Sequence, residues 1–479
     1  RSSVMGMERR AEQRTGFRGS WMYVIFSKQS VVDPSGREGW EITSDGKEEA
    51  DMTTKMLEKI LSEENLEEAK RKVMSNKGSA GVDKMTVFQL PKYIEEHSDE
   101  LCETIRKRKY RPLPVRRVQI PKDDGSKRNL GVPSVKDRWI EQAVCQVLTP
   151  IFEMEFSNAS YGFRSRRKAE QAVIKALEYM NDGYDWIVDL DLSKFFDNVN
   201  QDILMILVHK VIKDPDVESL IRRFLQGGVL VEGTFEETKV GTAQGSPISP
   251  LLANIYLNEF DKELSARGLR YVRYADDCII CVKSEMAANR VMKSVTKWLH
   301  EHLRVEVNAT KTKVSRPNGI KYLGFGFYHK QNEWRPKPHI KSINKLEYKL
   351  KPLLKRNWGV SMVYRMKKIN EVVRGWINYY RIADMKAIME RMDRKIRLHI
   401  RMCYWKQWKT VKNRANHLYF LGMPKYWCWL YANTRKGYCK AGQWLGRWIT
   451  NKLLNQKGLL CLVDHYAKVH TSQQLMLGL

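Results

Sequence analysis

The sequence predicts an α+β protein, in which a strand-rich middle section is followed by a helical and strongly basic C-terminal third. Two runs rich in β-branched and aromatic residues, 186–192 and 271–282, have the length and composition of buried strands. Between residues 361 and 382, apolar side chains recur every three or four residues, which is the helical period. The formal net charge is +29, and residues 341–479 hold 29 Lys and Arg against 6 Asp and Glu. Such an excess favours a polyanionic partner.

The N-terminal region divides into an extension and a helix. Residues 1–50 are polar and weakly patterned, which predicts an N-terminal extension. Residues 56–74 predict a charged amphipathic helix.

A β-hairpin is predicted where residues 116–122 and 127–133 flank an Asp-Asp-Gly-Ser turn. Its arms carry cations on both sides, which a purely structural hairpin does not need. Lys122 and Arg128 are therefore candidates for holding a triphosphate. The alternative interpretation is that these cations are only solvated.

Three carboxylates lie at the ends of predicted strands. Asp276 and Asp277 occupy a tight turn between apolar runs, and Asp191 follows another apolar run. Asp is common in turns, so a simple turn is the alternative interpretation. However, neighbouring half-buried carboxylates repel each other, and a bound cation relieves that repulsion. The pattern therefore predicts a site for two divalent ions, as nucleotidyl transfer requires, and its hard oxygen ligands suit Mg²⁺.

A glycine-bearing loop, 241–250, precedes a helix predicted at 251–264. Ser249 is the predicted N-cap, and Pro250 the first helical residue. An ordinary start of a helix would explain these two residues but not the Gln244-Gly245 pair, whose backbone could approach a ligand closely.

The basic C-terminal third predicts three helices, at 341–356, 361–382 and 383–408. This third also holds 8 of the 14 tryptophans, interleaved with Lys and Arg. Such aromatic residues can stack on bases while the cations follow the backbone. The alternative is that the tryptophans are core residues and the charges a solvated face. The middle helix has an apolar seam formed by Met362, Met366, Ile369, Val373, Trp376 and Tyr380.

Composition also limits where the protein works. Eight cysteines have no paired framework, which predicts a reducing compartment, and Cys278-x-x-Cys281 is interpreted as strand packing. No apolar run approaches the ~18 residues of a membrane span, so we expect a soluble, cytoplasmic protein.

At this point the residues resemble a family. Segments 191–196, 244–247, 274–277, 308–312 and 322–325 follow the order of the palm motifs of reverse transcriptases. They are most similar to bacterial group II intron reverse transcriptase/maturases, and the resemblance runs from about residue 57 to 466. Residues 374–380 also resemble the maturase segment, which in this family forms the thumb and contacts intron RNA.

The resemblance implies a role for each candidate. Asp191, Asp276 and Asp277 would coordinate two Mg²⁺ ions. Phe196 matches the aromatic gate against a 2′-hydroxyl, with core packing as the alternative. Lys122 and Arg128 match cations that hold the dNTP triphosphate, Gln244 a residue near the nascent pair, and Lys311 one near the leaving pyrophosphate. The chain departs from the family pattern at Ala243, Ser165-Arg166 and Gln201, none of which is a metal ligand.

The implied fold is a right-hand polymerase. Fingers would follow the extension at 51–185, a palm with an antiparallel sheet at 186–340, a helical thumb or maturase domain at 341–410, and a basic DNA-binding region at 411–479. The candidates for nucleic-acid binding are Arg374, Trp376, Lys406, Lys409, Arg435 and Lys436. After Cys461 only two histidines follow, so no HNH endonuclease is expected.

The implied function is an RNA-directed DNA polymerase and maturase. It would bind its group II intron RNA in a bacterial cytoplasmic ribonucleoprotein, assist splicing, and copy the intron by target-primed reverse transcription during retrohoming. Its partners would then include a DNA target, an RNA template with a DNA primer, and dNTPs. The alternatives are a reverse transcriptase of another bacterial class, retron or diversity-generating, and a splicing-only maturase with eroded palm acids.

Overall fold

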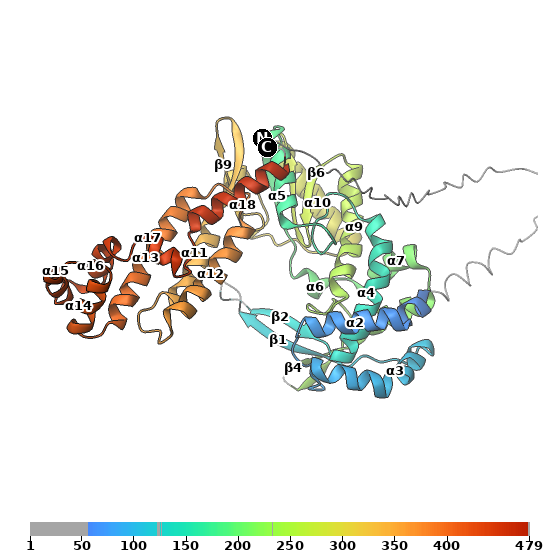
Figure 1. Ribbon diagram of the computed structural model, residues 1–479. Coiled ribbons are helices and arrows are strands. Elements are labelled where there is room, and N and C mark those ends of the chain that lie inside the picture. Colours follow the sequence, from blue (N-terminus) through green and yellow to red (C-terminus); the bar gives the residue numbers. More distant parts are fainter. Residues whose placement is uncertain (1–55, 122–124, 126, 232, 478–479) are drawn as a thin grey trace, which may run out of the picture. The chain divides into compact units, whose positions relative to one another are not determined.

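The computed structural model describes residues 56–121, 125, 127–231 and 233–477, with side chains up to residue 470. The predicted extension at 1–50 and the candidate Lys122 lie outside the described residues. Strands and helices are interspersed up to Pro338, and every described element beyond it is a helix (Figure 1). The α+β prediction is therefore confirmed.

The described N-terminal segment is helical but broken. Residues 56–61 are helical, Ser62 is extended, and α2 (Glu63–Ser75) starts anew after it, so the prediction of one continuous helix was wrong. The Ser62 hydroxyl donates to the Lys59 carbonyl, which ends the first segment. Helix α2 packs against α4 (Val135–Glu155), and α3 (Leu90–Arg106) lies between them in sequence.

The predicted hairpin is confirmed as part of a larger sheet. Strands β1 (Val115–Pro121) and β2 (Lys127–Val132) pair antiparallel. Strand β4 (Val229–Val231) joins β1 in parallel and carries β5 (Thr234–Glu236), which gives the order β2-β1-β4-β5.

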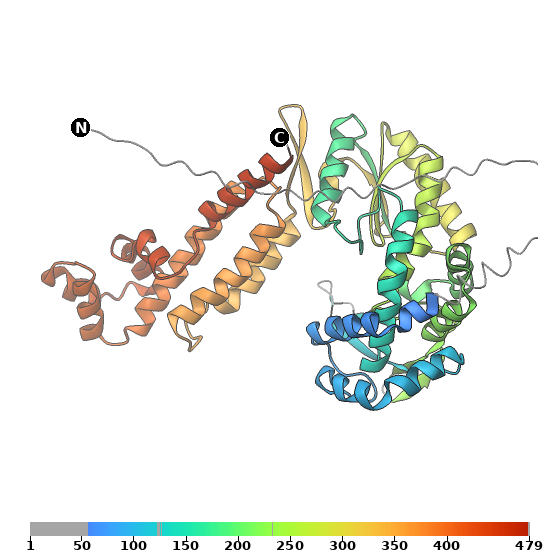
Figure 2. The same ribbon diagram turned by 45° about the vertical axis from the view of Figure 1, so that its right-hand side comes forward.

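A second sheet, which we call the central sheet, has the antiparallel order β6-β7-β3-β8. Its strands are β3 (Trp186–Asp191), β6 (Arg270–Tyr274), β7 (Asp277–Val282) and β8 (Lys313–Ser315). Helices α10 (Glu285–Leu303) and α5 (Ala169–Asn181) pack on it from opposite sides (Figure 2).

Side chains of the central sheet alternate between two cores, as the period of two in a strand requires. Val188 and Ile280 belong to the core under α10, whereas Ile187 and Ile279 belong to the core under α5. Cys278 and Cys281 are buried on opposite sides, which agrees with their interpretation as packing residues.

Four helices complete this part of the chain. They are α6 (Phe195–Asn198), α7 (Gln201–Ile212), α8 (Pro215–Gln226) and α9 (Ser249–Ala266). The predicted N-cap of α9 was wrong, because Ile248 occupies that position and Ser249 is the first helical residue. The Ser249 hydroxyl instead donates to the carbonyl of Ala243, within the preceding loop.

The C-terminal third is helical, as predicted. A hairpin of β9 (Phe325–Lys330) and β10 (Glu333–Pro338) precedes α11 (Ile340–Leu353), α12 (Met362–Tyr379) and α13 (Lys386–Gln407). The α12 seam is buried except at Trp376, which is half-buried. The remaining helices are α14 (Val411–Phe420), α15 (Lys425–Ala432), α16 (Gly437–Trp444), α17 (Asn451–Gln456) and α18 (Leu462–Leu477), the last of which packs against α12 and α13. Across the described ranges, no helix combines the length and apolarity of a membrane span.

Candidate active site

The turn between β6 and β7 brings two of the predicted carboxylates to the end of the central sheet. Tyr274 pairs with Asp277, so Ala275 and Asp276 form a two-residue hairpin loop. Asp277 in turn faces Asp191, the last residue of β3. Facing residues on antiparallel strands have Cβ atoms about 4.5–5.5 Å apart. Acids distant in sequence therefore meet at one end of the sheet.

A fourth carboxylate, Asp189, was missed as a site residue. It lies two positions before Asp191 and therefore points to the same side of β3, as does Asp277 on β7. The period of two in the run Asp189-Leu190-Asp191 was the signal that could have found it. Asp189 faces Lys313 of β8, which supplies a partial counter-charge.

Burial disfavours the ionised form of the carboxyl groups in this cluster. Burial, reinforced by Asp189, Asp276 and Asp191, raises the pKa of Asp277 to about 7. Burial also raises the pKa of Asp189 to about 6, and it raises the pKa of Asp276. A bound divalent cation would favour the ionised forms.

The carboxylate oxygens of this cluster suit a hard cation, but further ligands would have to come from substrate phosphates and water. Asp191 Oδ2 is buried and accepts no hydrogen bond from the described residues, although Lys311 Nζ lies 3.0 Å away as an ion partner. No three Asp, Glu, His or Cys side chains in the described ranges are placed to hold a metal by themselves. Mg²⁺ is commonly bound by one or two carboxylates together with substrate phosphates and water, and this site fits that arrangement.

A cavity of about 390 Å³ opens beside these carboxylates. Asp191 and Asp276 line it together with residues from three further segments of the chain, at 127–129, 244 and 308–311. Those predicted from the sequence are Arg128, Phe196, Gln244 and Lys311. Asp277 is not among the lining residues. Lys127, Lys194 and Asn308 also line the cavity and were not predicted. Acids and cations thus border one space, which suits a phosphate-bearing ligand held together with metal ions.

Phe196 is both a packing residue and a lining residue of the cavity. It is half-buried and packs against the core under α10. Its ring contacts that of Phe195 edge-to-face, with ring centroids 5.5 Å apart. It also lines the cavity.

The Gln244 loop contacts the β1–β2 hairpin closely. The amide of Gly131 donates to the Gln244 carbonyl over 2.8 Å. Gly245 has φ +129°, and a Cβ atom there would lie 2.5 Å from the Gly131 carbonyl oxygen. The loop therefore requires glycine at this position.

Beneath this loop lies a buried carboxyl group on α4. The Ser246 hydroxyl donates to Glu141 Oε2 over 2.5 Å, and burial raises the pKa of Glu141 to about 8. Glu141 is therefore protonated in the folded protein at neutral pH.

The β6–β7 turn is held in place by a buried guanidinium. Ala275 has φ +58°, which is unfavourable for a residue with a Cβ atom. Arg273 Nη1 donates to the Ala275 carbonyl over 2.9 Å and to Asn254 Oδ1 over 3.1 Å. The same side chain forms a buried ion pair with Asp261 of α9, with Nη2 donating to Oδ2 over 2.5 Å.

Gly162 packs directly against the backbone of the turn at Ala275. A Cβ atom at Gly162 would lie 2.2 Å from the amide nitrogen of Ala275. Asn254 Nδ2 donates to the Gly162 carbonyl, which joins this contact to the arginine network. The turn that carries Asp276 is thus fixed from two sides.

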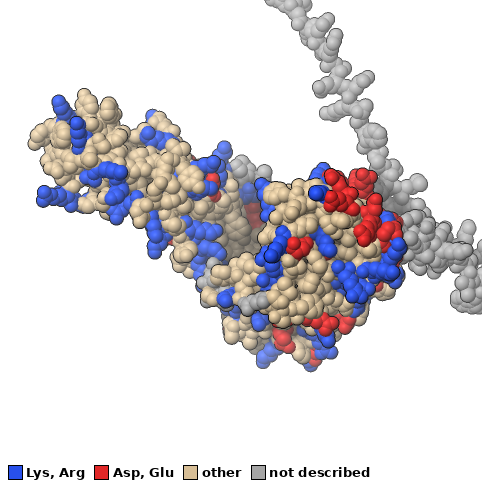
Figure 3. Space-filling view, turned by 90° about the horizontal axis from the view of Figure 1, so that it is seen from below, with Lys and Arg blue, Asp and Glu red and all other residues tan. Residues whose placement is uncertain are grey.

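The candidates for nucleic-acid binding lie on the C-terminal helices (Arg374, Trp376 and Lys406) and in the segments between them (Lys409, Arg435 and Lys436). Five of the six are exposed: Arg374, Lys406, Lys409, Arg435 and Lys436. Trp376 is half-buried against Tyr380. In Figure 3, Lys and Arg are spread over these helices with few Asp or Glu among them.

The tryptophans divide between the two interpretations made from the sequence. Trp405 and Trp408 are buried core residues, whereas Trp427 and Trp429 are 47% and 49% exposed.

Comparison with known proteins identifies the class. Residues 120–327 match the family model "Reverse transcriptase (RNA-dependent DNA polymerase)", and residues 343–420 match "Group II intron, maturase-specific domain". The first match contains all of the candidate active-site residues, and the fold is that of a reverse transcriptase. The second distinguishes the chain from reverse transcriptases without a maturase domain. The chain belongs to the family of group II intron-encoded reverse transcriptase/maturases.

Individual relatives agree with this assignment. Protein YkfC of Escherichia coli is 31% identical over 58% of this chain and 84% of its own length. Group II intron-encoded protein LtrA of Lactococcus lactis is 29% identical over 49% of this chain and 50% of its own length. The putative COX1/OXI3 intron 2 protein of Saccharomyces cerevisiae is 26% identical over 50% of this chain and 35% of its own length. The match therefore spans half or less of the last two relatives.

Proposed function

We propose that the protein is an RNA-directed DNA polymerase that copies its intron RNA by target-primed reverse transcription during retrohoming. The observation that carries this proposal is the cavity lined by Asp191, at the end of β3, and Asp276, in the β6–β7 turn, together with Arg128 and Lys311. Membership of the reverse transcriptase family supports it. The substrates would be dNTPs, an RNA template and a primer supplied by the DNA target.

In the proposed mechanism, Asp191, Asp276 and Asp277 would hold two Mg²⁺ ions together with oxygens of the substrate. When bound, the two ions would neutralise charge on the attacking and leaving oxygens. Arg128 would hold the triphosphate, together with Lys122, which lies outside the described residues. Lys311, whose Nζ lies 3.0 Å from Asp191 Oδ2, would neutralise negative charge on the departing pyrophosphate.

Two further residues would select the substrate. Phe196 lines the cavity from α6, the first helix after β3, and its ring would exclude a 2′-hydroxyl. Gln244 lines the same cavity and would lie near the nascent base pair.

Primer extension on an RNA template tests the polymerase proposal. Asp276→Asn removes a metal-binding charge without changing the size of the side chain, and it should reduce extension at least about a hundredfold. Binding of the primed template should persist. Asp202→Asn on α7, whose side chain is 80% exposed, is the matched control and should extend normally. Normal extension by Asp276→Asn would refute the proposal.

We also propose that the protein is a maturase that binds its group II intron RNA in a cytoplasmic ribonucleoprotein. The maturase-specific match at 343–420 and the exposed cations Arg374, Lys406 and Lys409 support this, with Arg435 and Lys436 contributing to DNA binding. In this proposal fingers span 51–185, the palm 186–340, the thumb 341–410 and the DNA-binding region 411–479.

Splicing of the intron that encodes the protein tests the maturase proposal. At low Mg²⁺, added protein should accelerate splicing, because bound cations would replace part of the Mg²⁺ that compacts the RNA. Asp276→Asn should accelerate splicing equally well. A splicing rate that is independent of protein would contradict this proposal.

A further inference from the structure

Gln201, one of the positions at which the chain departs from the family pattern, is a buried polar side chain that the proposed mechanism does not use. It is the first residue of α7 and is 6% exposed. A buried amide group requires hydrogen-bond partners, and buried carbonyl groups require a donor. The partners of Gln201 therefore indicate what it does.

The Gln201 side chain donates to two backbone carbonyls from separate segments. Its Nε2 lies 3.1 Å from the Leu225 carbonyl oxygen and 3.0 Å from that of Gly241. Leu225 lies in the last turn of α8, where carbonyl groups lack partners within the helix. Gly241 begins the loop that carries Gln244. One side chain thus connects the start of α7 and the end of α8 to the start of this loop.

The same loop is hydrogen-bonded to the backbone of Phe196. The Thr242 amide donates to the Phe196 carbonyl over 2.7 Å. The Gly241 amide donates to the Val199 carbonyl over 2.8 Å. The start of the loop therefore runs alongside the short segment that joins Phe196 to Gln201.

These two segments pack very closely. Gly241 has φ +88°, and a Cβ atom there would lie 2.7 Å from the Asp197 carbonyl oxygen and 2.9 Å from that of Phe196. An isolated β-bridge between Asn200 and Val240 lies next to this contact. A shift of the Gly241 carbonyl would therefore also displace the backbone of Phe196.

Phe196 needs this support because a cavity adjoins it on a second side. Besides the cavity beside Asp191, Phe196 lines a neighbouring one of about 290 Å³, together with Gly241 and Thr242. Packing next to a cavity fixes a side chain less tightly than a closed core does. A ring that excludes a hydroxyl group must nevertheless be held within about 0.5 Å of its working position. Hydrogen bonds to the backbone of Phe196 supply that restraint.

We propose that Gln201 is a positioning residue for Phe196 and thereby sets how strongly the enzyme discriminates dNTPs from rNTPs. Gln201 holds the Gly241 carbonyl, and the adjoining Thr242 amide holds the Phe196 carbonyl. The ring then keeps its place against the sugar of the incoming nucleotide. This inference rests on the proposed polymerase function and on the role proposed there for Phe196.

Extension of a primer by one nucleotide, with dGTP or GTP opposite a template cytidine, tests this role. The quantity measured is the kcat/KM for dGTP divided by the kcat/KM for GTP. Gln201→Met keeps the length of the side chain and removes both hydrogen bonds. Gln201→Asn, whose amide is one methylene shorter, is the second variant in case methionine prevents folding. The ratio should fall at least about tenfold, mainly because GTP is incorporated faster.

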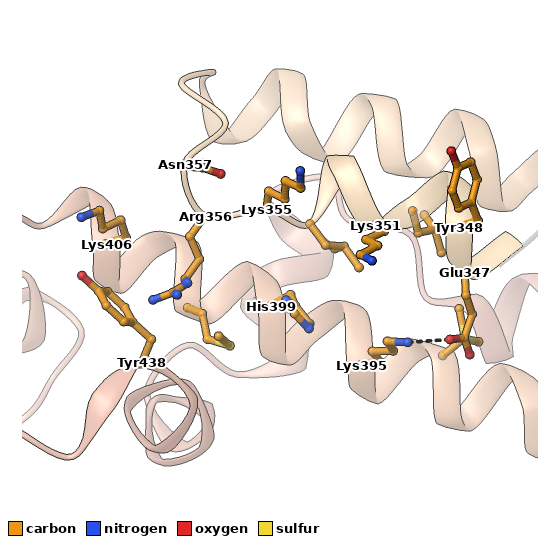
Figure 4. A pocket seen from close by; sticks show the side chains of 14 residues that line it. Glu347, Tyr348, Lys351, Lys355, Arg356, Asn357, Lys395, His399, Lys406 and Tyr438 are labelled. Carbon is orange, nitrogen blue, oxygen red and sulfur yellow. Dashed lines mark hydrogen bonds and ion pairs between the residues drawn. The ribbon is translucent and has the colours of Figure 1, made fainter. Parts of the chain in front are cut away.

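Two controls separate this effect from lost stability and from weaker template binding. Gln146→Met makes the same substitution on α4, where Gln146 Nε2 donates to the carbonyl oxygen and to Oδ1 of Asn65 over 3.0 and 2.7 Å. Lys406→Ala changes a candidate for nucleic-acid binding, which Figure 4 shows beside Arg356 and Tyr438 at a cavity of about 920 Å³. The first should lower the melting temperature and the second the affinity for primed template. Neither should change the ratio by more than about twofold.

A double-mutant cycle shows whether Gln201 acts through the ring. Phe196→Ala should lose most of the discrimination, and in that background Gln201→Met should change the ratio less than about twofold. Additive losses would overturn the proposal. An unchanged ratio in folded Gln201→Met, or in Gln201→Asn where methionine prevents folding, would also overturn it.

Hydrogen exchange provides a readout that needs no polymerisation. Without the Gln201 hydrogen bonds, the Thr242 amide should exchange faster than in the wild type, whereas Gln146→Met should leave its exchange unchanged. Equal exchange in the wild type and the Gln201 variant would contradict the positioning role. If the wild type incorporates dGTP but the Gln201 variant keeps the ratio, only the inference about Gln201 fails. If the wild type incorporates neither nucleotide, the polymerase proposal fails, and the inference about Gln201 fails with it.

Discussion

At the scale of single residues, the geometry of the carboxylates depends on the β6–β7 turn, in which Ala275 has an unfavourable backbone conformation. Ala275 adopts φ +58°, a conformation that costs a residue with a side chain about 1–2 kcal/mol. Arg273 and Gly162 compensate by fixing the Ala275 carbonyl and by leaving room beside its amide. Strain of this kind persists only where the surroundings determine it. The position of Asp276 is therefore set by buried residues that are not themselves ligands.

Arg273→Lys tests this positioning role. Lysine keeps the charge but cannot donate to Asp261, Asn254 and Ala275 together. We expect the maximal rate of primer extension to fall about tenfold or more, a higher Mg²⁺ concentration to be needed, and RNA affinity to be unchanged.

Arg397→Lys is the matched control for loss of stability. Arg397 is also buried in α13 and pairs with Asp393, far along the chain from the acids. Both variants should melt earlier, but only Arg273→Lys should shift the Mg²⁺ dependence. If the two variants behave alike in extension, Arg273 has only a structural role.

At the scale of elements, α4 and the Gln244 loop are joined by the protonated Glu141. The Ser246 hydroxyl reaches Glu141, and the amide of Gly131 reaches the carbonyl of Gln244. The loop thus lies between the β1–β2 hairpin and helix α4, and hydrogen bonds to both hold it in position. Such contacts between segments distant in sequence explain why Gln244-Gly245 looked unexplained in the sequence alone.

The pKa of Glu141 gives this element a predictable pH dependence. The folded pKa is about 8, against an ordinary value of 4.5, so between these values the unfolded chain binds fewer protons than the folded protein. This group therefore lowers the free energy of unfolding as pH rises from about 4.5 to about 8, by about 1.4 kcal/mol per pH unit. Above about 8 the effect levels off.

Glu141→Gln should remove this contribution. Compared with the wild type, the melting temperature of the variant should rise progressively between pH 5 and pH 8. Glu96→Gln on α3, where the side chain is 53% exposed, is the control and should follow the wild type. A constant difference between Glu141→Gln and the wild type at all pH values would contradict a protonated Glu141.

At the scale of the whole molecule, short-range sequence patterns predicted individual elements, whereas contacts between elements could not be predicted from them. The strand ending in Asp191, the two-residue turn before Asp277 and the seam of α12 all follow from short-range periodicity, and the structure has them. Asp189 could have been found by the same period of two. By contrast, the Arg273–Asp261 pair joins a strand to a helix, so it follows from no short-range period.

The predictions that failed also have local causes. Ser62 interrupts a pattern that reads as one helix, and Ser249 uses its hydroxyl within a loop instead of capping α9. In both cases the serine hydroxyl donates to a nearby backbone carbonyl, a local hydrogen bond that the hydrophobic pattern does not reveal.

The central claim is that carboxylates from two strands hold the divalent ions that drive polymerisation. The most direct measurement places Mn²⁺ in crystals of the protein with primed RNA template and an incoming dNTP, and locates it by anomalous scattering. The account predicts two peaks about 3.5–4 Å apart, in contact with Asp191 and the Asp276–Asp277 turn, and no peaks in Asp276→Asn. Ions bound elsewhere in an extension-competent complex, or extension by crystals without metal at these acids, would contradict it.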